Sequence, residues 1–361
     1  MSDTVTHTSP ATRDLCNRLE RALTRAGRGG GVRDLRPMAD TGLAHHHLWL
    51  TRDGDDWVAR LPKQSQLGLD AHANLDYQAA CFERAGRSGH APSLHGVLSP
   101  SEELPRGGLL VSAVRGRAAR LPADLPAIAE ALAHLHGLPL PPRDKRPPLL
   151  APADPWAAMR EEVAGQADYL EAAGLTAAVR QRLENELAAL PTQLPDSATA
   201  RPRLISFDAH PGNFLIRDDG SAVLVDLEKC RYGLTGFDLA HASLYTSTTW
   251  DVASHAELSP AQVADFYRRW MAISGLDDVA TLLTCRRAMW LWSLTWCAKW
   301  RASHGRAQDT EAQGEDWSAE LSDAALIAHV RDRVDHYLSL PAIKHVQREF
   351  DALATTLEKD A

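Results

Sequence analysis

The chain has 361 residues, and its 39 basic and 47 acidic side chains leave a formal net charge of −8. A hydrophobic content of 44% and a charged content of 24% are typical of globular proteins and exclude a wholly disordered chain. The acidic balance argues against a broad basic face for nucleic acid, and the length, at ~150 residues per domain, predicts two lobes.

Three features of the sequence predict a cytoplasmic protein without disulfides or membrane spans. The start of the chain lacks the apolar core of a secretory signal. The most apolar stretch, Leu282 to Trp300, is interrupted by Arg286, Arg287 and Lys299. The cysteines are scattered, and none forms a C-x-x-C pair.

The first 115 residues predict a small β-rich lobe. Leu15, Leu19 and Leu23 recur four residues apart, which indicates a helix over residues 13–27. Two apolar runs around a polar turn predict a hairpin, with strands near residues 46–51 and 57–61. A helix at about 74–86 and a strand at 109–114 complete this lobe, whose predicted bounds are residues 1–115.

The rest of the chain, residues 116–361, predicts a larger helical lobe. Helices are expected at residues 125–136, 155–172 and 176–190, and residues 237–357 are mostly helical in pattern. One β segment, at residues 203–226, interrupts them. The order of elements therefore predicts an α+β fold with two lobes.

The β segment carries the polar residues of greatest interest. Asp219-Gly220 lies between two apolar runs, as in a two-residue hairpin turn. That turn places Asn213 opposite Asp226, where an amide oxygen and a carboxylate can share a hard cation such as Mg²⁺. Asp208 precedes Asn213 by five residues, and the intervening Pro211-Gly212 lets the loop turn back toward the same place.

This pattern resembles the aminoglycoside phosphotransferase and choline kinase superfamily. The family's D-x-H-x-x-N loop corresponds to Asp208, His210 and Asn213, and its metal-binding aspartate after a hairpin corresponds to Asp226. The downstream G-x-D-L-A motif is present and includes Asp238. The run from Val225 to Glu228 is similar to the choline kinase form of the metal motif.

The resemblance implies a bilobal protein-kinase-like fold that uses ATP and Mg²⁺. Asp208 would then accept the proton of the substrate hydroxyl, and Asn213 and Asp226 would hold the metal. His210 and Asp238 would have supporting roles. The chain departs from the family at Ser206-Phe207, where the usual residues are His-Gly.

The resemblance also implies nucleotide contacts in the first lobe. Gly42 lies in the loop expected to cover the phosphates, although a single glycine is a weak signal. Arg60, with Lys63 as the alternative, would supply the phosphate-pairing cation. The expected acidic partner is absent at Gln78; Glu83 is the preferred substitute and Asp76 a further candidate. Ser112 to Val114 would contribute backbone groups to adenine.

Several aromatic and acidic residues are candidates for the acceptor site. Met289, Trp292, Trp296 and Trp300 form one helical stripe, which is either core or an aromatic wall for a cationic substrate. Trp250 and Asp251 either border the acceptor pocket or end a helix. Glu228 and Asp251 are the acids that could bind a cationic group.

The sequence therefore predicts a kinase that phosphorylates a hydroxyl of a small molecule. An amino alcohol such as choline and an aminoglycoside-type compound are both compatible with it. Two alternatives remain open: a pseudokinase that binds nucleotide as an interaction module, and a metal-dependent phosphoester hydrolase. The sequence chooses neither the acceptor nor the oligomeric state, and it does not separate ATP from GTP.

Overall fold

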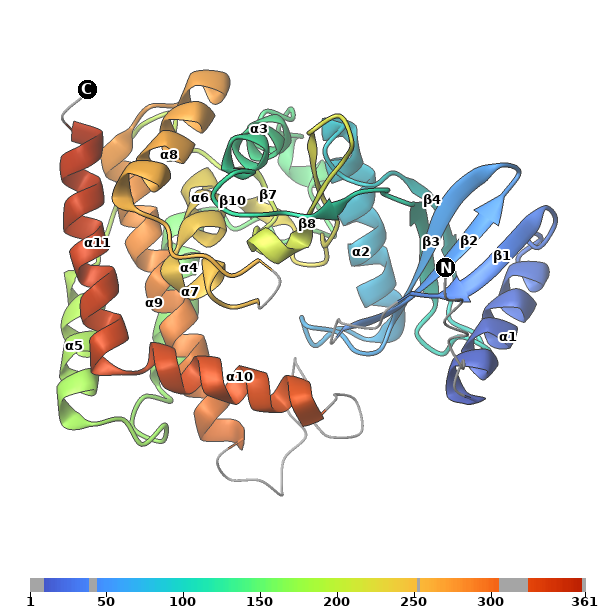
Figure 1. Cartoon of the computed structure of the whole chain (residues 1–361), viewed down its shortest axis with the longest axis horizontal. Helices are drawn as coiled ribbons and strands as arrows, with labels where there is room; N and C mark the ends of the chain where they lie inside the picture. The colour runs from blue at the N-terminus through green and yellow to red at the C-terminus, as the bar shows by residue number, and fades with distance from the viewer. Residues whose placement is uncertain (1–9, 39–43, 252–253, 305–323, 359–361) are drawn as a thin grey trace, which may run out of the picture. The chain divides into compact units, whose positions relative to one another are not determined.

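The computed structural model describes residues 10–38, 44–251, 254–304 and 324–358. By their mutual contacts these residues form two compact units. Residues up to 83 together with 92–113 make the first unit, and residues 84–91 with those from 114 onward make the second. Figure 1 shows strands dominating the first unit and helices the second, so the predicted α+β fold is confirmed.

The first unit contains a five-stranded antiparallel sheet with the order β1-β2-β3-β5-β4. Its strands are β1 (Val32–Pro37), β2 (His45–Arg52), β3 (Asp55–Pro62), β4 (Leu94–Leu98) and β5 (Gly108–Ser112). Asp53 and Gly54 join β2 to β3 with φ of 53° and 97°, the positive values that a two-residue hairpin loop requires. The predicted hairpin is therefore confirmed.

The two edge strands, β1 and β4, do not follow from the sequence pattern. Each contains an irregularity in its pairing, between Arg33 and Arg36 in β1 and between Leu94 and Gly96 in β4. Such a bulge breaks the strict alternation of apolar and polar side chains by which strands are recognised. Edge strands also lack a second neighbour, so their sequences are less constrained.

The helices of the first unit contact opposite faces of the sheet. From α1 (Pro10–Arg25), Leu19 and Leu23 pack in one core with Leu48 of β2. Side chains of successive strand residues alternate between faces, so Arg60 of β3 lies on the other face from Ala59. There the Arg60 guanidinium lies over the ring of Phe82 from α2 (Ala71–Ala85), 5.2 Å from its centroid.

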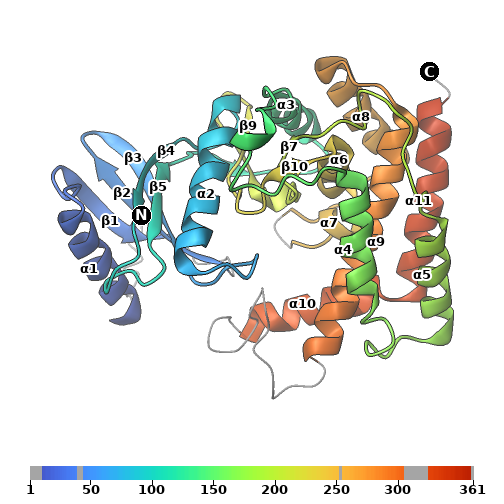
Figure 2. The same cartoon turned by 180° about the vertical axis from the view of Figure 1, so that it is seen from behind.

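The second unit consists mainly of helices, and Figure 2 shows them from the side opposite to that of Figure 1. Its helices are α3 (Leu125–His136), α4 (Pro155–Ala167), α5 (Ala177–Ala189), α6 (Thr235–Ser243), α7 (Tyr245–Thr248), α8 (Pro260–Ser274), α9 (Val279–His304), α10 (Ala324–Tyr337) and α11 (Leu340–Glu358). The long α9 packs against α4 and α6, and α8 packs against α3 and α11. These contacts make the helical core that carries the polar motifs.

Two short sheets lie among these helices. β6 (Arg117–Ala118), β8 (Phe214–Ile216) and β9 (Ala222–Leu224) form the first, and β7 (Arg203–Ile205) pairs with β10 (Arg231–Gly233) in the second. Several helix ends follow local signals. Ser259 and Gln262 form a capping box at the start of α8, and Gly275, with φ of 69°, ends that helix.

Within the described ranges, no helix combines the length and apolar character needed to cross a membrane. All five cysteines are present as thiols, and four of them are buried. The four buried thiols are core residues, and Cys16 of α1 is half-buried.

Candidate active site

The D-x-H-x-x-N residues lie in a loop of the second unit between its two small sheets. The loop follows β7 and ends in a single helical turn, Pro211–Asn213, which leads directly into β8. Inside the loop, the N–H of Asn213 donates to the carbonyl of His210 at 2.8 Å. Both ends of the loop are thus fixed by strand pairing.

Asp238 holds the start of this loop. Its carboxylate accepts hydrogen bonds from the N–H of Ser206, at 2.7 Å on Oδ2, and from the N–H of Phe207, at 2.8 Å on Oδ1. Asp238 is fully buried in the first turn of α6. Buried carboxylates are costly unless they are hydrogen-bonded, so this residue and the two amides stabilise one another.

Two further buried side chains complete the support of Asp238. His136 of α3 contacts Oδ2 through Nε2 at 3.1 Å, and the indole N–H of Trp270 donates to His136 Nδ1 at 3.1 Å. A histidine that accepts at Nδ1 and donates at Nε2 needs only one ring proton. The hydrogen-bonded series Trp270–His136–Asp238 therefore connects α8 and α3 to the loop that contains the D-x-H-x-x-N motif.

Phe207 occupies a position that favours glycine. Its φ is 58°, in the left-handed region, where a side chain costs about 1–2 kcal/mol. Its ring packs edge-on against the Trp292 ring, with 5.5 Å between the ring centroids. The Arg231 guanidinium lies 3.7 Å from the centroid of the Phe207 ring. These contacts, together with the hydrogen bond to Asp238, hold the strained backbone, so the Ser206-Phe207 departure leaves the loop supported.

The carboxylate of Asp208 lies between two basic side chains. Lys229 Nζ is 3.3 Å from Oδ2, and His241 Nδ1 is 3.8 Å from Oδ1. Burial lowers the pKa of His241 despite the neighbouring carboxylate, so this ring is neutral near pH 7. Asp208 keeps 19% of its side chain exposed, which leaves room for contact with a substrate.

The hairpin after the loop has a different register from the predicted one. Phe214 pairs with Leu224 and Ile216 pairs with Ala222. The loop is three residues long: the N–H of Arg217 donates to the Ser221 carbonyl at 2.9 Å, and Gly220 takes a φ of 83°. An Asp-Gly pair suits this loop as well as a two-residue turn, because glycine fills its left-handed last position.

The corrected register changes the neighbour of Asn213. Val225, not Asp226, lies opposite it, since the Val225 N–H donates to the Asn213 carbonyl at 2.9 Å. The prediction that Asn213 and Asp226 face each other directly is therefore wrong by one residue. Asp226 is the next residue along the chain, so the two still lie at the same end of the hairpin.

The oxygen groups at this end of the hairpin fit a magnesium ion. Asn213 Nδ2 donates to the Asp208 carbonyl at 2.9 Å, which leaves its Oδ1 as the atom able to bind a cation. The other candidate ligand is the carboxylate of Asp226. Among the described residues, no three His, Cys, Asp or Glu side chains converge as a metal site. Mg²⁺ is usually held by one or two carboxylates together with substrate phosphates and water, and the Asn213 amide oxygen and the Asp226 carboxylate are oxygen donors of this kind.

His210 is largely buried in the loop and hydrogen-bonded within it. Its Nδ1 accepts the N–H of Gly212 at 3.0 Å. Burial, reinforced by the nearby His241, lowers the pKa of His210 from 6.5 to about 4. The ring is therefore neutral at pH 7 and its Nδ1 is engaged, which favours the supporting role over proton transfer.

The two acids expected to bind a cationic substrate differ in exposure. Asp251 is half-buried and lies close to the loop, because a Cβ added to Gly212 would be 2.7 Å from its Oδ2. Glu228 is only 4% exposed. Of the two, Asp251 is the more accessible to a substrate.

The aromatic stripe on α9 divides into two parts. Met289 and Trp300 are buried core residues. Trp292 is half-buried beside the loop: its ring lies 6.5 Å from that of His241, and its N–H donates to Glu162 at 2.7 Å. Trp296 is half-buried and meets the edge of the Trp250 ring at 5.9 Å. Met289 and Trp300 are therefore core residues, whereas the aromatic wall for a substrate stays a prediction for Trp292 and Trp296.

In the first unit, Arg60 and Glu83 do not form an ion pair in the part that the structure describes. Arg60 is buried on β3 and contacts Phe82, whereas Glu83 is exposed on α2. Gln78, at the position expected to be acidic, is buried, and its Oε1 contacts His45 Nε2 at 2.9 Å. This contact between His45 and Gln78 links strand β2 to α2.

The remaining nucleotide-site candidates lie near the ends of strands. Lys63 follows β3 and is half-buried, and Gly42 lies outside the described residues. The backbone of Ser112 is engaged in the sheet, where its N–H donates to the Ser93 carbonyl at 2.9 Å. Val114 follows β5 and is half-buried.

Sequence reasoning missed four residues that shape this site. They are Lys229, His241, His136 and Trp270, all brought to the loop by tertiary contacts. Only Lys229 carried a local signal, because it follows the metal-motif residue Asp226 by three positions. The other three lie on helices whose packing the sequence alone does not reveal.

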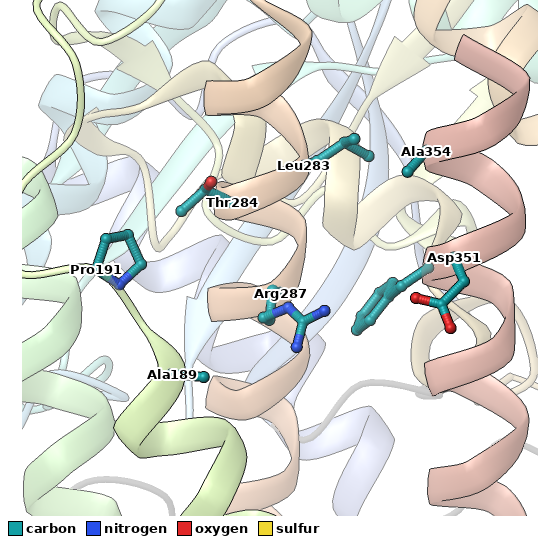
Figure 3. A pocket seen from close by; sticks show the side chains of 8 residues that line it. Ala189, Pro191, Leu283, Thr284, Arg287, Asp351 and Ala354 are labelled. Carbon is teal, nitrogen blue, oxygen red and sulfur yellow. The ribbon is translucent and has the colours of Figure 1, made fainter. Parts of the chain in front are cut away.

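A separate hollow of about 270 Å³ lies among α5, α9 and α11 (Figure 3). Leu283 and Arg287 of α9 lie on the side of Asp351 and Ala354 of α11, and Thr284 lies on the side of Pro191. Arg287 forms an ion pair with Glu186 of α5. None of the residues that line this hollow belongs to the predicted site.

Comparison with known proteins points to one family. The sequence profile of the phosphotransferase enzyme family matches residues 40–277. No curated protein matches the chain. The three solved structures described next are 12–16% identical to this chain, so they bear on the fold alone.

Three solved structures illustrate the shared fold. A protein assigned as an aminoglycoside phosphotransferase from Ralstonia eutropha has a TM-score of 0.61 at 12% identity, over 89% of this chain and 98% of its own. Plasmodium vivax ethanolamine kinase has a TM-score of 0.58 at 13% identity, and the match covers 92% of this chain and 89% of its own. Macrolide 2′-phosphotransferase from Brachybacterium faecium has a TM-score of 0.56 at 16% identity, and the match covers 81% of this chain and 94% of its own.

Proposed function

Since the chain belongs to the phosphotransferase enzyme family, we propose that it transfers the terminal phosphoryl group of ATP to a hydroxyl of a small molecule. The family match confirms the resemblance inferred from the sequence. The observation that carries the finer proposal is the loop itself. Asp208 is partly exposed, and Asn213 and Asp226 lie at the adjacent end of the hairpin.

Each loop residue would have a defined task in this reaction. Asp208 would accept the proton of the acceptor hydroxyl, and Asn213 Oδ1 and the Asp226 carboxylate would hold Mg²⁺. When bound, Mg²⁺ and ATP supply the transferable group and neutralise the charge on its oxygens. Asp238 would keep the loop in place, because Ser206 and Phe207 donate to it.

Residues from the first 115 positions of the chain would contribute contacts to the nucleotide. Arg60 is the better candidate for the phosphate-pairing cation, because its position on β3 is fixed by pairing with His47 and Leu109 on the neighbouring strands. Lys63 remains the alternative. For adenine we favour the backbone of Val114 over that of Ser112, whose N–H is already engaged.

The acceptor would be a compound that carries both a hydroxyl and a cationic amine. This proposal is supported by the half-buried Trp292 beside His241 and by Asp251 beside Gly212. Aromatic faces and carboxylates are the groups that bind ammonium ions. Amino alcohols and aminoglycosides both meet this description, and ethanolamine kinase and aminoglycoside phosphotransferases share the fold.

An ATP-consumption screen over amino alcohols, sugars and aminoglycosides tests the proposal. One acceptor class should stimulate turnover, and Asp208→Asn should lower it by about 10²–10⁴-fold while leaving the thermal midpoint unchanged. Asp265→Asn, at an exposed position on α8, is the matched control. Absence of turnover with every acceptor, together with unchanged ATP binding, would identify a pseudokinase. Phosphate release from esters without ATP would identify a hydrolase.

A further inference from the structure

We propose that Lys229 is a positioning residue that orients the carboxylate of Asp208 for proton acceptance. This inference rests on the proposed function, in which Asp208 is the base. Its starting point is the contact between Lys229 Nζ and Asp208 Oδ2 at 3.3 Å. Both side chains are mostly buried, with 17% and 19% exposed, so their interaction is less screened than that of a surface pair.

The backbone presents Lys229 in a turn that is anchored on both sides. The N–H of Cys230 donates to the carbonyl of Leu227 at 3.0 Å, which closes the turn. Leu227 and Cys230 are fully buried, and Glu228 is 4% exposed. Because its neighbours in the turn are fixed in the core, Lys229 has a defined starting point from which its ammonium reaches Asp208.

Asp208 and Lys229 lie in loops next to the two paired strands of one small sheet. β7 leads into the loop that contains Asp208, and β10 follows Lys229, with Arg231 opposite Ile205 in the pairing. Arg231 Nε also donates to the Lys229 carbonyl at 3.4 Å. Strand pairing therefore sets the distance between the two backbones, and the ion pair adds the orientation of the side chains.

Arg231 does not replace Lys229 at the carboxylate. Its NH1 contacts Glu162 at 3.2 Å, and its guanidinium lies over the Phe207 ring. His241 is neutral near pH 7, since burial lowers its pKa. Lys229 is thus the group that places a positive charge on Asp208 from this turn.

The two oxygens of Asp208 have different surroundings. Oδ2 lies at ion-pair distance from Lys229, whereas Oδ1 is 3.8 Å from His241 Nδ1, beyond hydrogen-bond length. Lys229 would hold Oδ2 and thereby direct Oδ1 toward the acceptor hydroxyl. Without the ammonium, the carboxylate can rotate about its bond to Cβ, and the reacting oxygen loses its fixed position.

The test compares Lys229→Met and Lys229→Arg with Lys344→Met, a control at an exposed position on α11. In Lys229→Met we expect kcat to fall by about 10–100-fold, with KM for ATP and acceptor within about twofold of the wild-type values. Lys229→Arg keeps the charge and should recover part of kcat. The control should match the wild type in every measurement.

A second readout needs neither substrate nor nucleotide. The positive charge of Lys229 lowers the pKa of His241, so Lys229→Met should raise that pKa in an NMR titration of the unliganded protein. Wild-type kcat in Lys229→Met, or an unchanged His241 pKa, would overturn the proposal. So would a rise confined to KM for ATP, which would place the lysine on the phosphates instead. If Asp208→Asn is itself fully active, the proposed function fails, and this outcome is distinct from the failure of Lys229 alone.

Discussion

Two regions of the molecule are stabilised in different ways. One is the loop of the second unit that contains the D-x-H-x-x-N motif, and the other is the β3–α2 region of the first unit. Buried hydrogen bonds fix the loop, where Asp238 accepts from the amides of Ser206 and Phe207. In the first unit the sheet satisfies the backbone, and side chains such as Arg60 and Phe82 meet through a cation–π contact.

The two regions also differ in how they keep the family pattern. The loop keeps the motif residues Asp208, His210 and Asn213 but departs at Ser206-Phe207, and the β3–α2 region lacks the expected acid. An irregular loop cannot satisfy its own buried N–H groups, so it needs a carboxylate of fixed position. Strands and helices satisfy their own backbone groups, so side chains that project from them, such as Gln78 on α2, can change. Accordingly, the D-x-H-x-x-N and G-x-D-L-A motifs are complete, whereas Gln78 stands where an acid was expected.

The largest effect is expected from removing the carboxylate that holds the loop. Asp238→Ala leaves three buried donors, on Ser206, Phe207 and His136, without an acceptor. The free energy of unfolding should fall by about 3–5 kcal/mol, as measured by urea denaturation. Asp265→Ala, at an exposed ion pair, should change it by less than about 1 kcal/mol. Equal effects of the two variants would show that the loop is not held in this way.

The pH dependence of stability should reveal His210 within the same loop. Its pKa is about 4 in the folded protein and near 6.5 when unfolded, so the unfolded state binds the proton first as pH falls. Stability should therefore decrease between pH 6.5 and 4, by about 3 kcal/mol from this residue.

Urea denaturation at several pH values, with wild type and His210→Asn, isolates the contribution of His210. The variant should lose less stability across this pH range than the wild type does. His255→Asn, at an exposed position, serves as the control and should follow the wild-type curve. An identical pH profile for His210→Asn would contradict the structural role of the ring.

In the first unit, Arg60→Met should weaken ATP binding by about 10–100-fold, because a charge-assisted contact to phosphate is lost. Glu83→Gln should leave the Kd within about twofold, since Glu83 is exposed and makes no ion pair with Arg60 in the described structure. Isothermal titration calorimetry measures both. A large effect of Glu83→Gln would restore the expected strand–helix ion pair in the nucleotide-bound protein.

The smallest effect is expected at the aromatic edge of the loop. Trp292→Phe keeps a ring near Phe207 but loses the hydrogen bond to Glu162, so stability should fall by about 1 kcal/mol. The acceptor KM should rise several-fold while the KM for ATP is unchanged. Trp300→Phe, in the core of the same helix, should alter stability alone. An unchanged acceptor KM in Trp292→Phe would place the acceptor elsewhere.

Local signals predicted much of the fold. The helix predicted at residues 125–136 coincides with α3, and the β2–β3 hairpin was expected from its polar turn. The hairpin at Gly220 was predicted with a register wrong by one residue. Asp-Gly is compatible with two loop lengths, and the choice between them depends on the pairing of Phe214 with Leu224.

The sequence by itself determined the two-part α+β architecture and the motif residues Asp208, Asn213 and Asp226, because periodicity and motif spacing are properties of neighbouring positions. Only the tertiary structure decided what surrounds those residues. Lys229 and His241 reach Asp208 from a turn and a helix that follow it in the chain. Their distance depends on how β10 pairs with β7 and how α6 packs in the helical core, and no local pattern encodes that packing.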